Sequence, residues 1–339
     1  MIDKTLSSKI SNMGVVCAML VVLCHIFPKV KIGSFTWCID RFINDGIGRT
    51  AVPYFFIVSG FFLARHIGEK GWWKKAVRTR LRTLIVPHLI WNFLWLLMPM
   101  ALVASANLLR GRSVCSNIAI PSWGGLFALP PLGPTWYIRT LFLFIVLSPL
   151  FVTMLKSNAN MTFAVSFLFY VMFYRSVAVP FGTWRAIPNT PLALEGLVYF
   201  LYGIKLAMDG KSRDVSLNLT IAAVAVSVFF TVVRIYCKAN GHIFLYNHIR
   251  FLVIPGFLWA MWKIVPSNSW PKWITSSAFA IYLIHPFVIF MFKKFACHRI
   301  DGFLPYFACA VLAILSPITV RCLLSAVSKR LTSVVFGGR

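Results

Sequence analysis

The stretch LIVPHLIWNFLWLLMPMALVASAN, residues 84–107, decides the fold class of this chain. It contains no Asp, Glu, Lys or Arg, and it is longer than the roughly 20 helical residues that cross a bilayer. Similar apolar runs recur along the whole chain, with short loops between them. The expected spans are residues 13–28, 49–66, 84–107, 137–155, 161–179, 191–208, 216–236, 247–265, 274–292 and 303–327. We therefore predict an all-α, polytopic integral membrane protein of about ten transmembrane helices.

The composition favours one membrane domain over several soluble ones. Of the 339 residues, 59% are hydrophobic and 12% are charged, and the mean hydropathy is +0.79. A water-exposed shell could not cover that much apolar surface. The formal net charge of +26 would suggest nucleic acid for a soluble protein, but here the basic residues lie in short loops, where they meet membrane lipids. We expect residues 1–339 to form a single transmembrane domain that has no nucleic-acid partner.

The basic residues also predict an orientation. In the loop 65–82, seven Lys or Arg residues stand against one acid, Glu69. By the positive-inside rule this loop is cytoplasmic, and an even number of spans then places both termini in the cytoplasm. Lys293, Lys294 and Arg299 fall on the outer side and depart from the rule. No clear small-residue cleavage site follows the first apolar run, so we interpret that run as a retained transmembrane helix.

Several ionisable residues fall inside the expected spans or at their ends. A bilayer forces such a side chain toward the bundle interior or a watery cavity, so function is the default interpretation. His25 lies near the end of the first span and could accept a proton near neutral pH, or it could simply wet the helix end. Glu195 is the one acidic residue in the expected spans, and it needs a hydrogen-bonding or cationic partner unless it is interfacial. Arg139 and His285 lie in similar positions, whereas His88 is better explained by packing.

A basic run, residues 74–82, enters the third expected span and includes Arg78, Arg80 and Arg82. Arginines two apart fan around a helix rather than line one face. Some of them could contact lipid phosphate while others clasp a phosphate-bearing cofactor. The run could equally be only a topology signal.

The eight cysteines show no spacing typical of a metal site, and we expect no metal. Four of them lie in apolar spans, where a thiol packs as a small hydrophobe. The other four fall in or beside outer segments, where an oxidising compartment would permit disulfides: Cys38, Cys115, Cys237 and Cys297.

Five segments occur in the order seen in one family of membrane enzymes: His25 in the first span, then residues 52–62, 82–92, 136–139 and 281–286. Together they resemble the acyltransferase 3 family over nearly the whole chain. Members of that family are ten-helix enzymes that move an acyl group, usually acetyl from cytoplasmic acetyl-CoA, onto hydroxyls of cell-envelope glycans. The resemblance implies an O-acyltransferase of a bacterial inner membrane. It also implies that His25 is the essential histidine and that the basic run is the arginine motif of the third helix.

The resemblance has two departures. The family typically carries an arginine eleven residues before the histidine, where this chain has Gly14, and the nearest preceding cation is Lys9. Arg78, Arg80 and Arg82 also do not have the commonest family spacing. This subgroup could do without the missing arginine, another cation could replace it, or the chain could have drifted from acyl transfer.

The resemblance suggests a mechanism. Acyl-CoA would bind from the cytoplasm with its phosphates near Arg78, Arg80 and Arg82, and its thioester would approach His25. His25 would take the proton of a hydroxyl on a polysaccharide or glycolipid acceptor, or carry the acyl group itself. Arg139 or His285 could stabilise the oxyanion, and Glu195 could orient an imidazole. Two alternative functions remain. One is a transporter or flippase of a glycan or lipid-linked sugar, which would need no CoA. The other is an inactive protein that serves as a partner in envelope assembly.

Overall fold

The structure is a computed structural model that describes residues 3–111, 113, 133–172, 194–210, 215–296 and 300–338. Within these residues the chain folds into helices and forms no strand, so the all-α prediction is confirmed. The first half contains α1 (Lys4–Leu23), α2 (Phe35–Asp45), the 3₁₀ turn η1 (Ile47–Thr50), α3 (Ala51–Ala64), α4 (Trp72–Arg80), the π-helical turn η2 (Leu81–Ile85), α5 (Val86–Leu109), η3 (Gly133–Thr135), α7 (Trp136–Val146), α8 (Ser148–Ser157) and α9 (Ala159–Met172).

The second half is built in the same way. It contains η4 (Leu194–Gly196), α10 (Leu197–Asp209), α11 (Leu217–Ala239), α12 (Ile243–His248), α13 (Arg250–Ile264), α14 (Lys272–Thr275), α15 (Ala278–Met291), the π-helical turn η5 (Phe292–Ala296), α16 (Phe303–Val327) and α17 (Lys329–Val335).

Seven helical segments in the described residues are long and apolar enough to cross a membrane, and the bent pair α7–α8 would make eight. Several combine consecutive elements, such as Phe35–Ala64, Trp72–Leu109 and Ala278–Ala296. The expected spans 161–179 and 191–208 lie partly outside the described residues. In the described part, α9 supplies a shorter apolar helix and α10 covers Leu197–Asp209. The chain is thus a multi-pass membrane protein, while the count of ten and the cytoplasmic termini stay predictions.

The surface of the bundle carries large apolar side chains, as a lipid-facing surface requires. On α11, Ile221, Phe229 and Val232 are all exposed. Water would penalise so much apolar area on one helix, whereas lipid tails would not.

The fourth span bends by 60° between α7 and α8. Pro149 lies at the start of α8 and has no N–H to give to the carbonyl of Ile145, four residues back. The Ser148 hydroxyl donates to that carbonyl instead, at 2.7 Å. The bend is therefore explained by the sequence Ser148–Pro149, and no buried carbonyl is left over.

The centre of the bundle is the contact between α3 and α10. A Cβ atom built on Gly203 would lie 2.0 Å from the carbonyl oxygen of Ile57, and one built on Gly60 would lie 2.1 Å from that of Phe200. Only glycine allows two helix backbones to approach so closely, an arrangement common in membranes. Phe144 of α7 packs beside this contact, with its ring 5.5 Å from that of Phe200. The tight α3–α10 pair thus fixes the position of α7.

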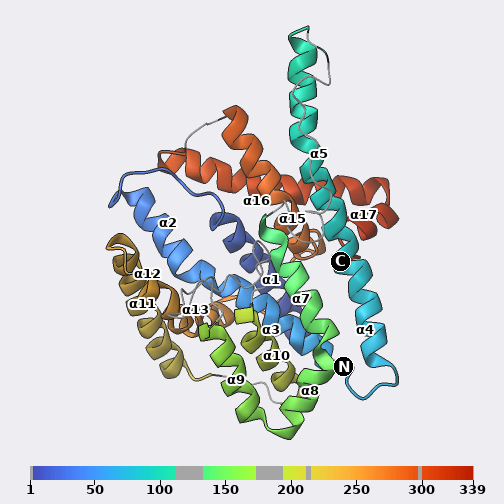
Figure 1. Ribbon diagram of the computed structural model, residues 1–339, viewed down its shortest axis with the longest axis vertical. Helices are drawn as coiled ribbons and strands as arrows, with labels where there is room; N and C mark the ends of the chain where they lie inside the picture. Colours follow the sequence, from blue (N-terminus) through green and yellow to red (C-terminus); the bar gives the residue numbers. More distant parts are fainter. Residues whose placement is uncertain are drawn as a thin grey trace.

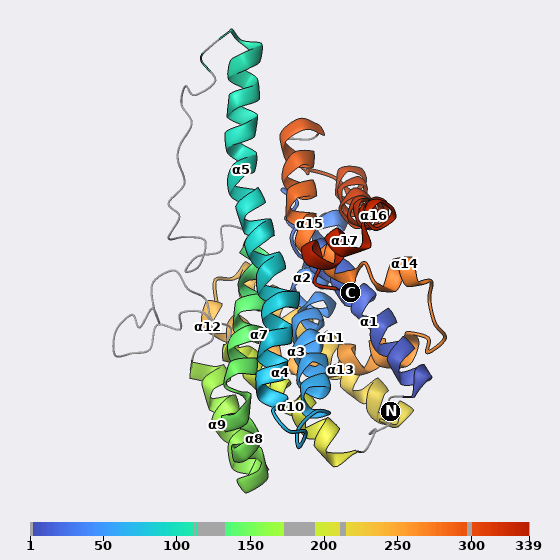
Figure 2. The same ribbon diagram turned by 90° about the vertical axis from the view of Figure 1, so that its right-hand side faces the viewer.

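Helices α3, α15 and α16, which surround the His25 end of the candidate site, pack against α1 (Figures 1 and 2). Helix α1 packs against α3 on one side and α15 on the other, and α15 packs against α16. Helices α4 and α5 form one long rod through η2, and the far end of α5 projects beyond the other helices (Figure 1). Two candidate disulfide cysteines, Cys38 and Cys237, carry free thiols, while Cys115 and Cys297 lie outside the described residues.

Candidate functional site

His25 lies just beyond α1, which ends at Leu23. Its backbone N–H still bonds to the carbonyl of Val22, and its ring Nδ1 lies 2.7 Å from the carbonyl of Val21. A carbonyl only accepts, so Nδ1 carries the hydrogen and Nε2 carries the lone pair of the neutral ring. Two residues on, Phe27 has a φ of 48°, which is rare and strained for a side chain of that size. The chain therefore leaves α1 through a constrained turn beside His25.

His285 of α15 lies against His25, with a distance of 5.1 Å between the two ring centroids. It is fully buried. Its Nδ1 also contacts a carbonyl one turn back, that of Ile281, at 3.0 Å. Its Nε2 has no hydrogen-bond partner within the described part of the chain. The site thus holds two imidazoles of the same tautomer, and because like charges repel, such a pair accepts one proton more readily than two.

Tyrosines connect this pair to other helices. The Tyr282 ring lies 6.4 Å from that of His285 and 6.0 Å from that of Tyr137 on α7, and the Tyr282 hydroxyl donates to the carbonyl of Pro134. Tyr137 packs on Phe56 of α3 at 4.8 Å, and its helix α7 packs against α4 and η2, which carry the basic run. Four of the five family-like segments, those that contain His25, Phe56, Tyr137 and Tyr282, are therefore joined by ring contacts.

The basic run forms an open hollow of about 570 Å³. Its lining is Lys74, Lys75, Arg78, Thr79, Arg82 and Thr83, which share one side of α4 and η2. The volume falls within the roughly 300–1,000 Å³ of small-molecule sites. Arg80 does not line it and instead lies toward Tyr137. The expectation that the three arginines fan around the helix is confirmed, and the structure assigns Arg78 and Arg82 to the hollow.

The hollow keeps its positive charge because Glu69, the acid of the preceding loop, already has partners. The hydrogen bond from His66, at 2.8 Å, lowers the pKa of the Glu69 carboxyl, and Lys75 lies 3.6 Å from that carboxylate. Glu69 therefore partly neutralises the charge of Lys75, and the charges of the arginines are free to bind an anionic ligand.

A π-helical turn shapes the floor of this region. Pro87, near the start of α5, has no N–H for the carbonyl of Thr83, four residues back, and the helix widens at η2. The C-terminal segment packs against the Thr83 carbonyl, which lacks its helical donor. A Cβ atom on Gly337 would lie 2.1 Å from the Thr83 carbonyl oxygen, and the Trp91 Nε1–H donates to the carbonyl of Val335. Residues after α17 thus pack against the turn that presents Arg82.

The other expected residues interact with groups other than the two imidazoles. Arg139 is half-buried on α7, and its charge acts on His88 of α5. His88 is buried with Asn92, as packing predicts. Glu195 lies 3.9 Å from Arg250, the first residue of α13, so it has the cationic partner that its burial requires.

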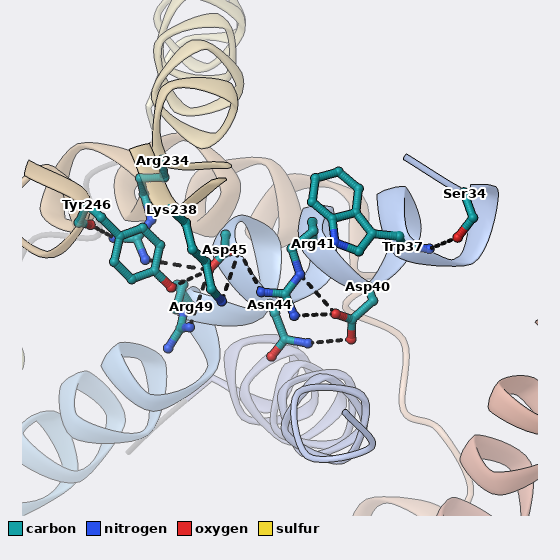
Figure 3. Close-up of polar contacts among 10 residues, drawn as sticks. All are labelled: Ser34, Trp37, Asp40, Arg41, Asn44, Asp45, Arg49, Arg234, Lys238 and Tyr246. Carbon is teal, nitrogen blue, oxygen red and sulfur yellow. Dashed lines mark hydrogen bonds and ion pairs between the residues drawn. The ribbon is translucent and has the colours of Figure 1, made fainter. Parts of the chain in front are cut away.

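Sequence reasoning missed one cluster near His25. Asp45 is fully buried among Arg41, Arg49, Arg234 and Lys238, and Asp40 pairs with Arg41 (Figure 3). The expected second span began at residue 49, which excluded both acids, whereas the apolar helical segment begins at Phe35. The i, i+4 pairs of Asp45 with Arg41 and with Arg49 were the signal available in the sequence.

A family model described as an acyltransferase domain, that of the acyltransferase 3 family, matches residues 10–322. No curated protein and no solved structure matches the chain. The matched range runs from α1 into α16 and includes His25, His285, the basic run and the Asp45 cluster.

Proposed function

The chain belongs to the acyltransferase 3 family, and we propose that it moves an acyl group, with acetyl the first to test, from cytoplasmic acyl-CoA to a hydroxyl of an extracytoplasmic glycan or glycolipid. One observation carries this proposal. The contact between His25 and His285 continues through Tyr282 to Tyr137 of α7, and α7 packs against α4 and η2, which carry the basic hollow. A donor anchored at the hollow would thus have a polar and aromatic route toward an imidazole.

The hollow suits the nucleotide end of acyl-CoA. That end carries a diphosphate and a ribose phosphate, and guanidinium groups bind phosphate through short, charge-assisted hydrogen bonds. Arg78 and Arg82 line the hollow together with Lys74 and Lys75. Arg80, which lies toward Tyr137, would mark where the pantetheine arm enters the bundle. Orientation with the hollow in the cytoplasm follows from the positive-inside rule.

At His25 the chemistry needs one lone pair. In the direct route, Nε2 accepts the proton of a sugar hydroxyl as the oxygen attacks the thioester carbonyl. The C–S bond then breaks, and the leaving thiolate takes the proton back from the imidazolium. In the covalent route, Nε2 attacks the carbonyl first, the C–S bond breaks and the CoA thiolate leaves; the sugar oxygen then displaces Nε2 from the acyl-imidazole, and the hydroxyl proton passes to the thiolate. Because the contact with Val21 fixes the hydrogen on Nδ1, both routes use Nε2.

His285 would act as a positioning residue for His25. A neutral, buried neighbour at 5.1 Å gives the His25 imidazolium a polar surface without a competing full charge. Arg139 beside His88, and Glu195 beside Arg250, would instead hold helices together.

The position of the missing family arginine is open. A Cβ atom on Gly14 would meet nothing within 4 Å, and Lys9 lies over the Trp262 ring at 5.1 Å. A Cβ atom would therefore fit at residue 14, and the Lys9 ammonium already contacts an aromatic ring. We propose that transfer in this chain depends on the basic hollow alone for donor charge.

The test is the O-acetyl content of envelope glycans in cells that lack the protein, carry it, or carry His25→Ala at the same membrane level. The proposal expects acetyl to be lost without the protein and restored only by the unmodified chain. If His25→Ala restores acetyl fully, then His25 takes no part in transfer.

A further inference from the structure

Asp45 is the centre of a buried charged cluster formed by α2, η1, α11 and α12 (Figure 3). One Asp45 oxygen accepts from the Tyr246 hydroxyl at 2.5 Å and lies 3.6 Å from Arg49 and 3.8 Å from Arg234. The other lies 3.3 Å from Arg41 and 3.8 Å from Lys238. We call these residues, together with Asp40, the Asp45 cluster.

The Asp45 cluster has more positive than negative charge. Two acids face four cations, and only Arg41 reaches Asp45 within hydrogen-bond distance. Arg234 is 0% exposed; its Nη1 donates to the Tyr246 carbonyl, while its Nε and Nη2 have no hydrogen-bond partner in the described residues. The Nε of Arg49 is also buried and also has no hydrogen-bond partner in the described residues. Buried guanidinium groups with unused donors need a counter-anion.

The Asp45 cluster is adjacent to the proposed reaction centre. Cys24, the residue before His25, is within electrostatic range of Arg49 and Asp45, and its sulfur packs against Gly48. On the other side of His25, the Lys293 ammonium donates to the carbonyl of Ile26 at 2.5 Å. Cationic groups therefore flank His25 from both neighbouring residues.

A second polar group near the cluster belongs to α16, which packs against α2. The Tyr306 hydroxyl of α16 is buried, has no hydrogen-bond partner in the part of the chain described, and is within electrostatic range of Asp40 and Cys24. Access is from the rim, because the side chains of Lys238 and Arg49 are 40% and 29% exposed while that of Asp45 is fully buried.

We propose that the Asp45 cluster binds an anionic group, a carboxylate or phosphate, of the acceptor, so that the acceptor class is an anionic glycan or glycolipid. This inference rests on the function proposed above. Lys238 and Arg49 would meet the anion first, and the fork of Arg234 would hold it in a fixed orientation relative to His25. Lys293 and Lys294, which depart from the positive-inside rule in the expected orientation, would add attraction for the same ligand.

The first arm of the test measures the charge of the product. Membranes that contain the protein are given radiolabelled acetyl-CoA, and the labelled glycan is applied to an anion exchanger. Label on glycans that bind the exchanger supports the proposal, and label confined to neutral glycans overturns it. If no glycan is labelled although acetyl-CoA binds the purified protein, the proposed function fails and this inference with it.

The second arm uses Lys238→Gln, with Lys238→Arg as the variant that keeps the charge and Lys31→Gln as a control. Lys31 is exposed in the loop after His25 and lies outside the Asp45 cluster. We expect Lys238→Gln to lower transfer about tenfold, the effect of one lost charge-assisted hydrogen bond, with acetyl-CoA affinity unchanged and transfer restored by arginine. Unchanged transfer overturns the proposal, as does a loss that arginine does not restore. A rate that follows the anionic lipid content instead of the charge on Lys238 would assign the cluster to lipid headgroups.

Discussion

Replacing Arg78 and Arg82 by glutamine should weaken donor binding by an amount that the structure sets. A hydrogen bond to a charged group contributes about 1.5–3 kcal/mol when it is buried. Both side chains are exposed in the hollow, so solvent screening reduces each contribution to about 1.4 kcal/mol, or tenfold in the dissociation constant. The two arginines are four residues apart on one side of the helix, and neighbours of this kind couple. The double variant should therefore bind acetyl-CoA less than about a hundredfold more weakly than the unmodified chain.

The assay is the dissociation constant of acetyl-CoA for purified protein, together with the KM for acetyl-CoA in transfer. Lys70→Gln is the matched control, because Lys70 is an exposed cation of the preceding loop that does not line the hollow. If Lys70→Gln weakens binding as much as Arg78→Gln, the effect is one of general charge. If Arg78→Gln and Arg82→Gln both bind acetyl-CoA with unchanged affinity, the hollow is not the donor site.

Three further substitutions test other parts of the structure. Gly203→Ala should lower the membrane level and the melting temperature of the protein, because its Cβ would lie 2.0 Å from the Ile57 carbonyl oxygen. Gly14→Ala is the control and should match the unmodified chain, because its Cβ would meet nothing within 4 Å. Equal stability of the two variants would contradict the α3–α10 packing. His285→Ala should lower kcat about tenfold or more with the KM for acetyl-CoA unchanged, and an unaltered kcat would show that His25 acts without it. Asp45→Asn should lower the free energy of unfolding by roughly 3–5 kcal/mol, since it leaves buried cations without their acid. Thermal or denaturant unfolding measures this loss. A stability equal to that of the unmodified chain would mean that water reaches the Asp45 cluster.

The sequence predicts the helices well where an apolar run alone determines them. Residues 84–107 and 303–327 appear within long helices near the expected positions. The second span was placed too late because Asp40, Arg41 and Asp45 make its first half look like a loop. Those charges are acceptable inside the bundle because they meet Arg234 and Lys238 of α11, about 190 residues away in the chain.

The candidate site was predictable as separate residues and not as an arrangement. An isolated His25 in an apolar span is a signal in itself, and His285 next to Pro286 gives a weaker one. Their contact brings the first helix against α15, which no local pattern encodes. The different roles of Arg78 and Arg80 likewise follow from the packing of α7 against α4 and η2.

The central claim is that His25 carries acyl transfer, and one measurement tests it most directly. Purified protein in lipid nanodiscs, unmodified or with His25→Ala, is given radiolabelled acetyl-CoA and extracted envelope glycan, and alkali-labile label on the glycan is counted. The proposal predicts label with the unmodified chain and a loss of at least a hundredfold with His25→Ala, while both proteins bind acetyl-CoA equally. Equal labelling by the two proteins would contradict it.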